Sequence, residues 1–98
     1  MNANEYINGM ADLIRTTSAE YVKVENIDGK KRIAAKFHSV SEMNAEMKKA
    51  FIANAETLKA LNAGLKALRA SGEIKSATNC WAPTLFEGGI ELRMDFGF

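Results

Sequence analysis

The chain has 98 residues, fewer than the roughly 150 of an average domain, so we expect one domain and no room for a two-domain enzyme. Hydrophobic residues make up 47% and charged residues 26%, which is the usage of a globular protein rather than of a disordered or fibrous chain. The formal net charge of +1 lies far below the positive excess that is typical of nucleic-acid-binding modules.

Apolar runs and cysteine content bear on the compartment. The longest uninterrupted apolar run, from Ala50 to Ala53, has four residues, so we expect neither a membrane span nor a secretory signal. The single cysteine, Cys80, has no partner for a disulfide within the chain, and a stable reduced thiol is typical of the cytosol. We therefore expect a cytoplasmic protein.

The start of the chain predicts a short amphipathic helix. Apolar residues recur at helical spacing over residues 2–16, and Asn2 with Glu5 has the spacing of a capping box. Residues 16–18 are Thr, Thr and Ser, which favour bonds from the side chain to the local backbone over a continued helix. The helix is therefore expected to end there.

A β-hairpin is expected next. Residues 20–27 and 31–40 alternate between β-branched or aromatic residues and polar ones. Asp28 and Gly29 between them suit a two-residue turn, because both tolerate the backbone conformation that such turns require.

A long helix is predicted from a second capping-box pattern, Ser39 with Glu42, to Ser71-Gly72. One of its faces carries a seven-residue repeat with one polar member, formed by Met47, Phe51, Asn54, Leu58, Leu61, Leu65 and Leu68. The thirty residues from 41 to 70 would form a rod of about 45 Å, whereas a globule of this chain length is about 34 Å across.

This mismatch in length predicts a homodimer. The seven repeat residues would form its interface, and Asn54 would set the register, because protruding leucines would otherwise face water. The alternative is a helix that breaks near Gly64 and buries its leucines within one chain.

The last third of the chain predicts two further strands, at residues 74–81 and 90–96, with Gly88-Gly89 leading into the second. Residues 82–87 are either a short extra strand or a loop. The order α-β-β-α-β-β predicts an α+β domain spanning residues 1–98. Its antiparallel sheet would carry the short N-terminal helix and the long central helix.

Two segments are candidate partner-binding sites. Lys30, Lys31 and Arg32 lie together at the tip of the hairpin, and residues 21–49 hold seven Lys or Arg against four Asp or Glu. Trp81, Leu85 and Phe86 would form an apolar anchor if their segment protrudes. The simpler interpretations are solvated turn lysines and core residues.

Side chains with catalytic potential are few. His38 and Ser39 are neighbours on a predicted strand and would point to opposite faces, which does not suit a nucleophile and its base. Cys80 is interpreted as a small buried apolar residue. Glu91 and Asp95 flank Arg93 on one strand face, which predicts a salt-bridged outer face rather than an acid-base pair. One histidine and one cysteine do not make a zinc site, so we expect no metal, no cofactor and no enzymatic activity.

Three classes of function remain. The first is a small non-enzymatic interaction protein, such as a stoichiometric inhibitor or adaptor, which acts as a homodimer; phage-encoded antagonists of bacterial complexes are of this type. The second is a nucleic-acid-binding module that uses the basic hairpin at residues 23–36. The third is a dimeric α+β domain that holds an apolar ligand against Phe37, Trp81 and Met94.

Overall fold

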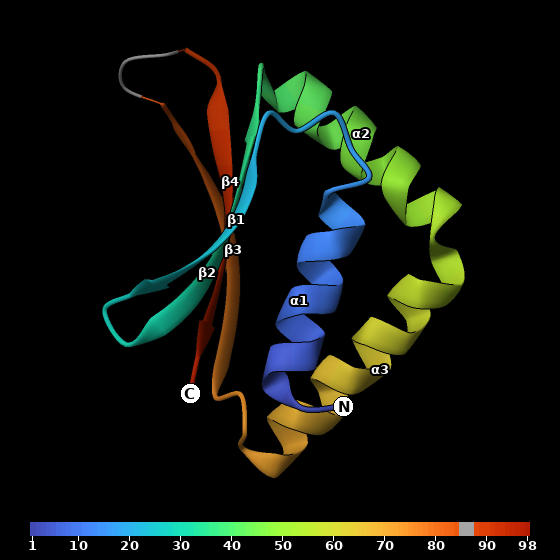
Figure 1. Ribbon diagram of the computed structural model, residues 1–98, viewed down its shortest axis with the longest axis vertical. Helices are drawn as coiled ribbons and strands as arrows, with labels where there is room; N and C mark the ends of the chain where they lie inside the picture. Colours follow the sequence, from blue (N-terminus) through green and yellow to red (C-terminus); the bar gives the residue numbers. More distant parts are fainter. Residues whose placement is uncertain (85–87) are drawn as a thin grey trace.

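The computed structural model describes residues 1–84 and 88–98 as one α+β domain (Figure 1). Its elements are α1 (Ala3–Ile14), β1 (Val22–Ile27), β2 (Lys30–Phe37), α2 (Val40–Ala53), α3 (Ala55–Ser71), β3 (Ser76–Pro83) and β4 (Ile90–Gly97). The four strands form one antiparallel sheet in the order β1-β2-β4-β3. All three helices lie on one side of this sheet, and no described helix covers its other face.

The first helix begins and ends where the sequence indicates. The Asn2 side chain accepts a hydrogen bond from the Glu5 N–H at 2.8 Å, and the Glu5 carboxylate accepts one from the Asn2 N–H, so the capping box is confirmed. At the other end, the hydroxyls of Thr16 and Thr17 donate to backbone carbonyls of the last turn, at 2.7 and 2.6 Å. The same carbonyls also accept hydrogen bonds from the backbone N–H groups of Thr16 and Thr17, so the last turn closes on itself and the helix ends.

The expected hairpin is confirmed. Asp28 and Gly29 have φ values of +50° and +76°, the pair of positive angles that a type I′ turn needs. Because the turn has two residues, it fixes the register, with Ile27 opposite Lys30 and Val24 opposite Ile33. Val24 and Ile33 therefore lie on the same face as the helices.

The segment predicted as one long helix is two helices. Ser39 caps α2 by accepting from the Glu42 N–H at 3.1 Å, as expected, but the helix breaks at Asn54 rather than near Gly64. Asn54 leaves the helical conformation, with φ −118° and ψ 36°, and its side-chain amide donates to the Ala50 carbonyl at 2.8 Å. An asparagine that bonds the backbone in this way competes with helix continuation, so the order of elements gains one helix.

The break at Asn54 resolves the mismatch in length. The whole molecule is 39 Å along its longest axis, shorter than the rod of about 45 Å that a straight helix would form. Since α3 turns back against α1, Leu61 and Leu68 are buried inside their own chain, and Met47, Phe51, Leu58 and Leu65 are half-buried against the same core. The premise that these leucines need a second copy to cover them is therefore not met.

The core lies between the sheet and α1. The central pair of strands places Ile33 opposite Met94 and Phe37 opposite Ile90, all four facing the helices and buried. Fully or almost fully buried α1 side chains lie over them: Tyr6, Ile7, Met10, Ala11 and Ile14. The Tyr6 and Phe96 rings meet edge to face with centroids 5.5 Å apart, a favourable aromatic geometry.

The packing of α3 against α1 can be tested by truncating large aliphatic side chains. Leu61 is 3% exposed, so Leu61→Ala should lower the free energy of unfolding by about 2–5 kcal/mol, because it leaves a cavity between α3 and α1. Ile52 is 69% exposed on α2, and Ile52→Ala should change it by less than about 0.5 kcal/mol. Urea unfolding followed by circular dichroism measures both, and equal losses would contradict this packing.

Candidate interaction surfaces

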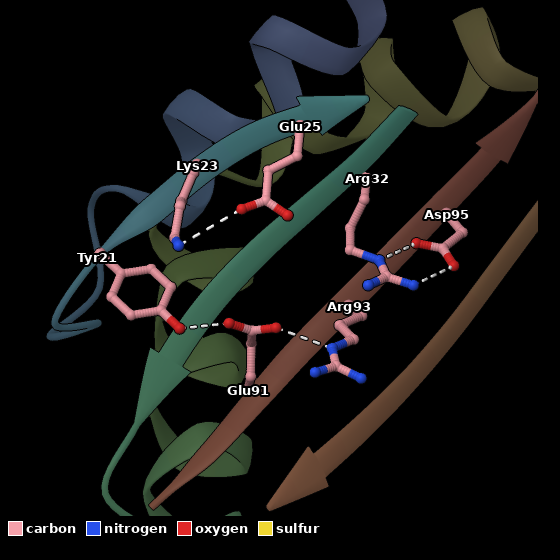
Figure 2. A network of polar contacts seen from close by, with 7 residues as sticks. All are labelled: Tyr21, Lys23, Glu25, Arg32, Glu91, Arg93 and Asp95. Atoms are coloured by element: carbon pink, nitrogen blue, oxygen red, sulfur yellow. Dashed lines mark hydrogen bonds and ion pairs between the residues drawn. The ribbon is translucent and has the colours of Figure 1, made fainter. Parts of the chain in front are cut away.

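The face of the sheet opposite the helices, here called the outer face, carries ordered charges (Figure 2). Strand alternation directs the side chains of β1, β2 and β4 toward this face at Lys23, Glu25, Arg32, Glu91, Arg93 and Asp95. Their signs alternate between neighbouring strands, which predisposes them to pair. The salt-bridged outer face predicted from Glu91, Arg93 and Asp95 is confirmed.

One cross-strand ion pair joins β2 to β4. Arg32 donates two hydrogen bonds to Asp95, from Nε to Oδ1 at 2.8 Å and from Nη2 to Oδ2 at 3.1 Å. Both side chains are 21% exposed, and the two parallel bonds hold the guanidinium and the carboxylate in one relative orientation. The pair is therefore more rigid than an ordinary surface ion pair.

Glu91 connects two further groups. Its carboxylate accepts one hydrogen bond from the Tyr21 hydroxyl and another from Arg93 Nε, the latter at 2.8 Å. The ammonium of Lys23 lies 4.5 Å from the centroid of the Tyr21 ring and 3.4 Å from a carboxylate oxygen of Glu25. These contacts form one network that joins Tyr21 and β1 to β4.

Two carboxyl groups of the outer face have lowered pKa values. For Asp95, the hydrogen bonds from Arg32 lower the pKa and outweigh the opposing effect of partial burial. For Glu91, partial burial is the largest single influence and raises the pKa, but the hydrogen bonds from Tyr21 and Arg93 together bring it below its ordinary value. Both carboxyls are ionised at neutral pH, so neither can serve as a proton donor to a substrate.

The three basic residues of the hairpin do not form a cluster. Lys30 is exposed at the turn, Lys31 Nζ donates to the Asn4 side chain on α1 at 2.6 Å, and Arg32 is paired with Asp95 on the outer face. Adjacent strand residues point to opposite faces, which separates Lys31 from Arg32. The cationic charge of the tip is thus divided between two surfaces.

The second candidate segment forms β3, at one edge of the sheet. Trp81 stands opposite Leu92 on the helical side, but it is 48% exposed, contrary to the interpretation as core. Cys80 is also exposed, on the outer face opposite Arg93, so the expectation of a buried thiol is wrong. The two exposures have different causes: the helices make most of their contacts with the sheet at β1 and β2, away from the Trp81 edge, and no described helix covers the outer face on which Cys80 lies. Leu85 and Phe86 lie outside the described residues.

The direction of the β3 backbone groups follows from one hydrogen bond. The Thr84 N–H donates to the Gly89 carbonyl at 3.1 Å, and hydrogen-bonded pairs alternate along an antiparallel ladder. Cys80 and Thr78 therefore turn their backbone groups toward β4. Ala77, Asn79 and Trp81 turn theirs away from the sheet, as does Pro83, which has no N–H to donate.

A cleft of about 320 Å³ separates α3 from the β3 edge. Its lining includes Phe51, Leu58 and Leu65 from the helices and Ala77, Asn79 and Met94 from the strands. A smaller cavity of about 180 Å³ adjoins it toward α2 and shares three of the lining residues, Phe51, Asn79 and Met94. The hollow beside the edge strand is thus lined mainly by apolar side chains, together with Asn62, Arg69 and Asn79. Trp81 lies on the same face of β3 as Asn79, two residues further along the strand.

Chemistry-bearing groups are dispersed over the part of the chain that the structure describes. His38 is exposed just beyond the end of β2. Within residues 1–84 and 88–98, no three His, Cys, Asp or Glu side chains gather as metal ligands would, and no helix is both long and apolar enough to span a bilayer.

Comparisons with protein-family models, with curated proteins and with solved structures found no match to this chain.

Two features of these surfaces were not predicted from the sequence. The pairing of Arg32 with Asp95 depends on β2 and β4 being neighbours, which strand order decides and local alternation does not. The sequence did indicate that β3 lies at an edge. From Ser76 to Pro83 it has no charged residue, and it ends in proline, which within sheets is confined to edges and bulges.

The pairing of Asp95 makes stability depend on pH. Its folded pKa lies below the ordinary value of 3.8, so the carboxylate contributes stability that is complete above that value and is lost as the pH falls through the folded pKa. Asp95→Asn should lower the free energy of unfolding at neutral pH and flatten its decline between about pH 5 and pH 2. Urea unfolding across this range measures both effects.

The control for this experiment is Asp12, whose ion pair with Arg15 on α1 is exposed. Asp12→Asn should leave the free energy of unfolding at neutral pH nearly unchanged, because exposed pairs contribute little. If the two variants lost the same stability, the Arg32–Asp95 pair would contribute no more than an exposed ion pair does.

Proposed function

We propose that this chain is a non-enzymatic interaction protein, a stoichiometric inhibitor or adaptor, which binds a protein partner with the outer face of its sheet. The observation that supports the proposal is the state of that face: its acids and bases are held in pairs with each other. Such groups are fixed in place for recognition, whereas catalysis needs an acid or base poised to exchange a proton.

Pairing also prepares the face for binding. A side chain that is already held by an ion pair loses less conformational entropy when a partner covers it. The alternating signs suit a partner surface with the complementary pattern, which gives specificity more than raw affinity.

Mixed charge favours a protein over a nucleic acid. Phosphate backbones are bound by cations that release counterions, and Arg32 and Arg93 on this face are already neutralised by Asp95 and Glu91. Lys31 is turned toward α1 and bonds Asn4 there, so the hairpin tip does not present a continuous basic ribbon.

Charge-swap variants test the proposal without altering the net charge. Arg32→Asp with Asp95→Arg, and Lys23→Glu with Glu25→Lys, keep each ion pair possible while reversing its direction on the outer face. The matched control is Asp12→Arg with Arg15→Asp, the same exchange at an exposed pair on α1. Circular dichroism establishes that all three proteins are folded.

The readout is affinity capture from a lysate of the source cells, followed by mass spectrometry, with and without nuclease. We expect one protein that the wild type and the α1 control retain and both outer-face swaps lose, regardless of nuclease. Retention by the outer-face swaps would contradict the proposal, and loss of the captured material on nuclease treatment would favour the nucleic-acid alternative.

One feature favours a second function, binding of a small apolar ligand. The cleft between α3 and β3 has a volume suited to a ligand, and Met94 lies in its wall. Phe37 is 2% exposed and belongs to the core, while Trp81 is exposed on β3. A ligand in the cleft should shift the fluorescence of Trp81, the sole tryptophan, because Trp81 lies on the same face of β3 as the cleft-lining Asn79.

A further inference from the structure

The two edges of the sheet are protected to different degrees. β1 carries Lys23 and Glu25, and the Arg15 side chain reaches its edge, with Nη2 3.4 Å from the Val22 carbonyl oxygen. β3 carries no charge from Ser76 to Pro83. Charged residues and covering groups are the usual means by which proteins prevent strand addition at an edge, and the middle of β3 has neither among the contacts described.

The ends of β3 limit the open stretch. At one end, the Lys75 N–H donates to the Gly97 carbonyl at 2.8 Å, although Gly97 stands opposite Ser76, so two residues face one and the strand bulges. At the other end, the backbone of Pro83 faces outward, and proline has no N–H to donate. The outward N–H and C=O groups between these limits belong to Ala77, Asn79 and Trp81.

We propose that a second copy of this chain occupies this edge, with the two β3 strands antiparallel about a two-fold axis through Asn79. In this register Asn79 pairs with its own counterpart, and Ala77 pairs with Trp81 of the second copy. Every outward N–H of one copy then meets an outward C=O of the other, which completes both strands. A register centred on Cys80 would instead set Ala77 against Pro83, which has no N–H to donate.

The absence of charge favours a second copy over an unrelated strand. A charged residue near a two-fold axis faces its own counterpart, so self-pairing strands must avoid charges there, whereas partners of different sequence use charges for selection. β3 meets this condition along its whole length.

The cleft provides a place for Trp81. In the proposed register Trp81 lies beside Ala77 and diagonally to Asn79 of the second copy, and both of these residues line that copy's cleft of about 320 Å³. An indole that is 48% exposed in the single chain would thus be covered at each end of the paired strands. Tryptophans seated in pockets are among the residues that contribute most of the binding energy in many complexes.

The first experiment measures mass in solution by light scattering after size exclusion. The wild type should have twice the chain mass of 10.7 kDa at micromolar concentration. Asn79→Pro removes an outward N–H without removing a bond to β4, and it should give a folded monomer. Asn26→Pro makes the same change at an outward position of β1 and should remain dimeric.

Trp81→Ala should raise the dissociation constant of the dimer by more than about tenfold. A monomeric wild type at about 100 µM would overturn the proposal, since a specific dimer forms well below this concentration. The proposal would also be overturned if Asn79→Pro and Asn26→Pro were both still dimeric. An apolar dye that enters the cleft of a monomeric wild type would assign the cleft to a small ligand instead.

The second experiment tests the register by disulfide cross-linking. In the proposed dimer Thr78 stands opposite Cys80 of the second copy in a non-hydrogen-bonded pair, with Cα atoms about 4.5 Å apart, within the range for a disulfide. A protein carrying Thr78→Cys with Cys80→Ser has one cysteine, as the wild type has. When the wild type and this variant are mixed and mildly oxidised, each should cross-link to the other protein and not to a second copy of itself.

Efficient cross-linking of the wild type alone would place Cys80 on the axis and overturn the register together with the position of Trp81. The proposed dimer goes beyond the proposed binding function of the outer face, and each proposal can be contradicted without contradicting the other. The charge swaps leave β3 unchanged and should leave the mass dimeric, whereas Asn79→Pro leaves the outer-face ion pairs intact.

Discussion

The position of α1, packed on β1 and β2 and against α3, is the constraint on which the rest of the structure depends. Its buried side chains supply much of the helical half of the core, and Leu61 of α3 approaches Gly9 so closely that a Cβ there would lie 2.9 Å from a Leu61 methyl. Glycine thus lets the two helices approach. Once α1 occupies this place, α2 and α3 must pass around it, and the break at Asn54 allows them to do so.

The same placement explains where the molecule is open. Because α1 makes its closest sheet contacts with β1 and β2, the β3 edge is covered less completely, and a cleft lined by side chains of all three helices and of β3 and β4 is left there. The outer face has no helix at all among the described residues, and its cross-strand pairs stabilise it in place of apolar packing.

Local patterns were sufficient for much of the fold. The capping box of Asn2, the Asp28-Gly29 turn and the alternating charges of β4 each act within a few residues, and all three are confirmed. The break at Asn54 was not predicted, because the same asparagine also fits an inward position of a heptad, and only tertiary packing decides between the two.

The exposure of Trp81 and Cys80 was beyond local reasoning for a different reason. Alternation along a strand says which residues share a face but not whether that face is covered, and covering depends on which side of the sheet the helices pack and on the order of the strands. The candidate site was therefore predictable in composition more than in arrangement. The outer-face ion pair within β4 was anticipated, whereas the partnership of Arg32 with Asp95 required knowing which strands are neighbours.

The unequal edges also bear on how far association can proceed. A sheet with two bare edges can add molecules at both sides and grow into filaments, the ordinary hazard of exposed strands. Here Arg15, Lys23 and Glu25 guard β1, so a molecule joined at β3 presents only guarded strands to the solvent. Growth would stop at a closed pair, and neutralising the guards on β1 would make the protein prone to fibrous aggregation.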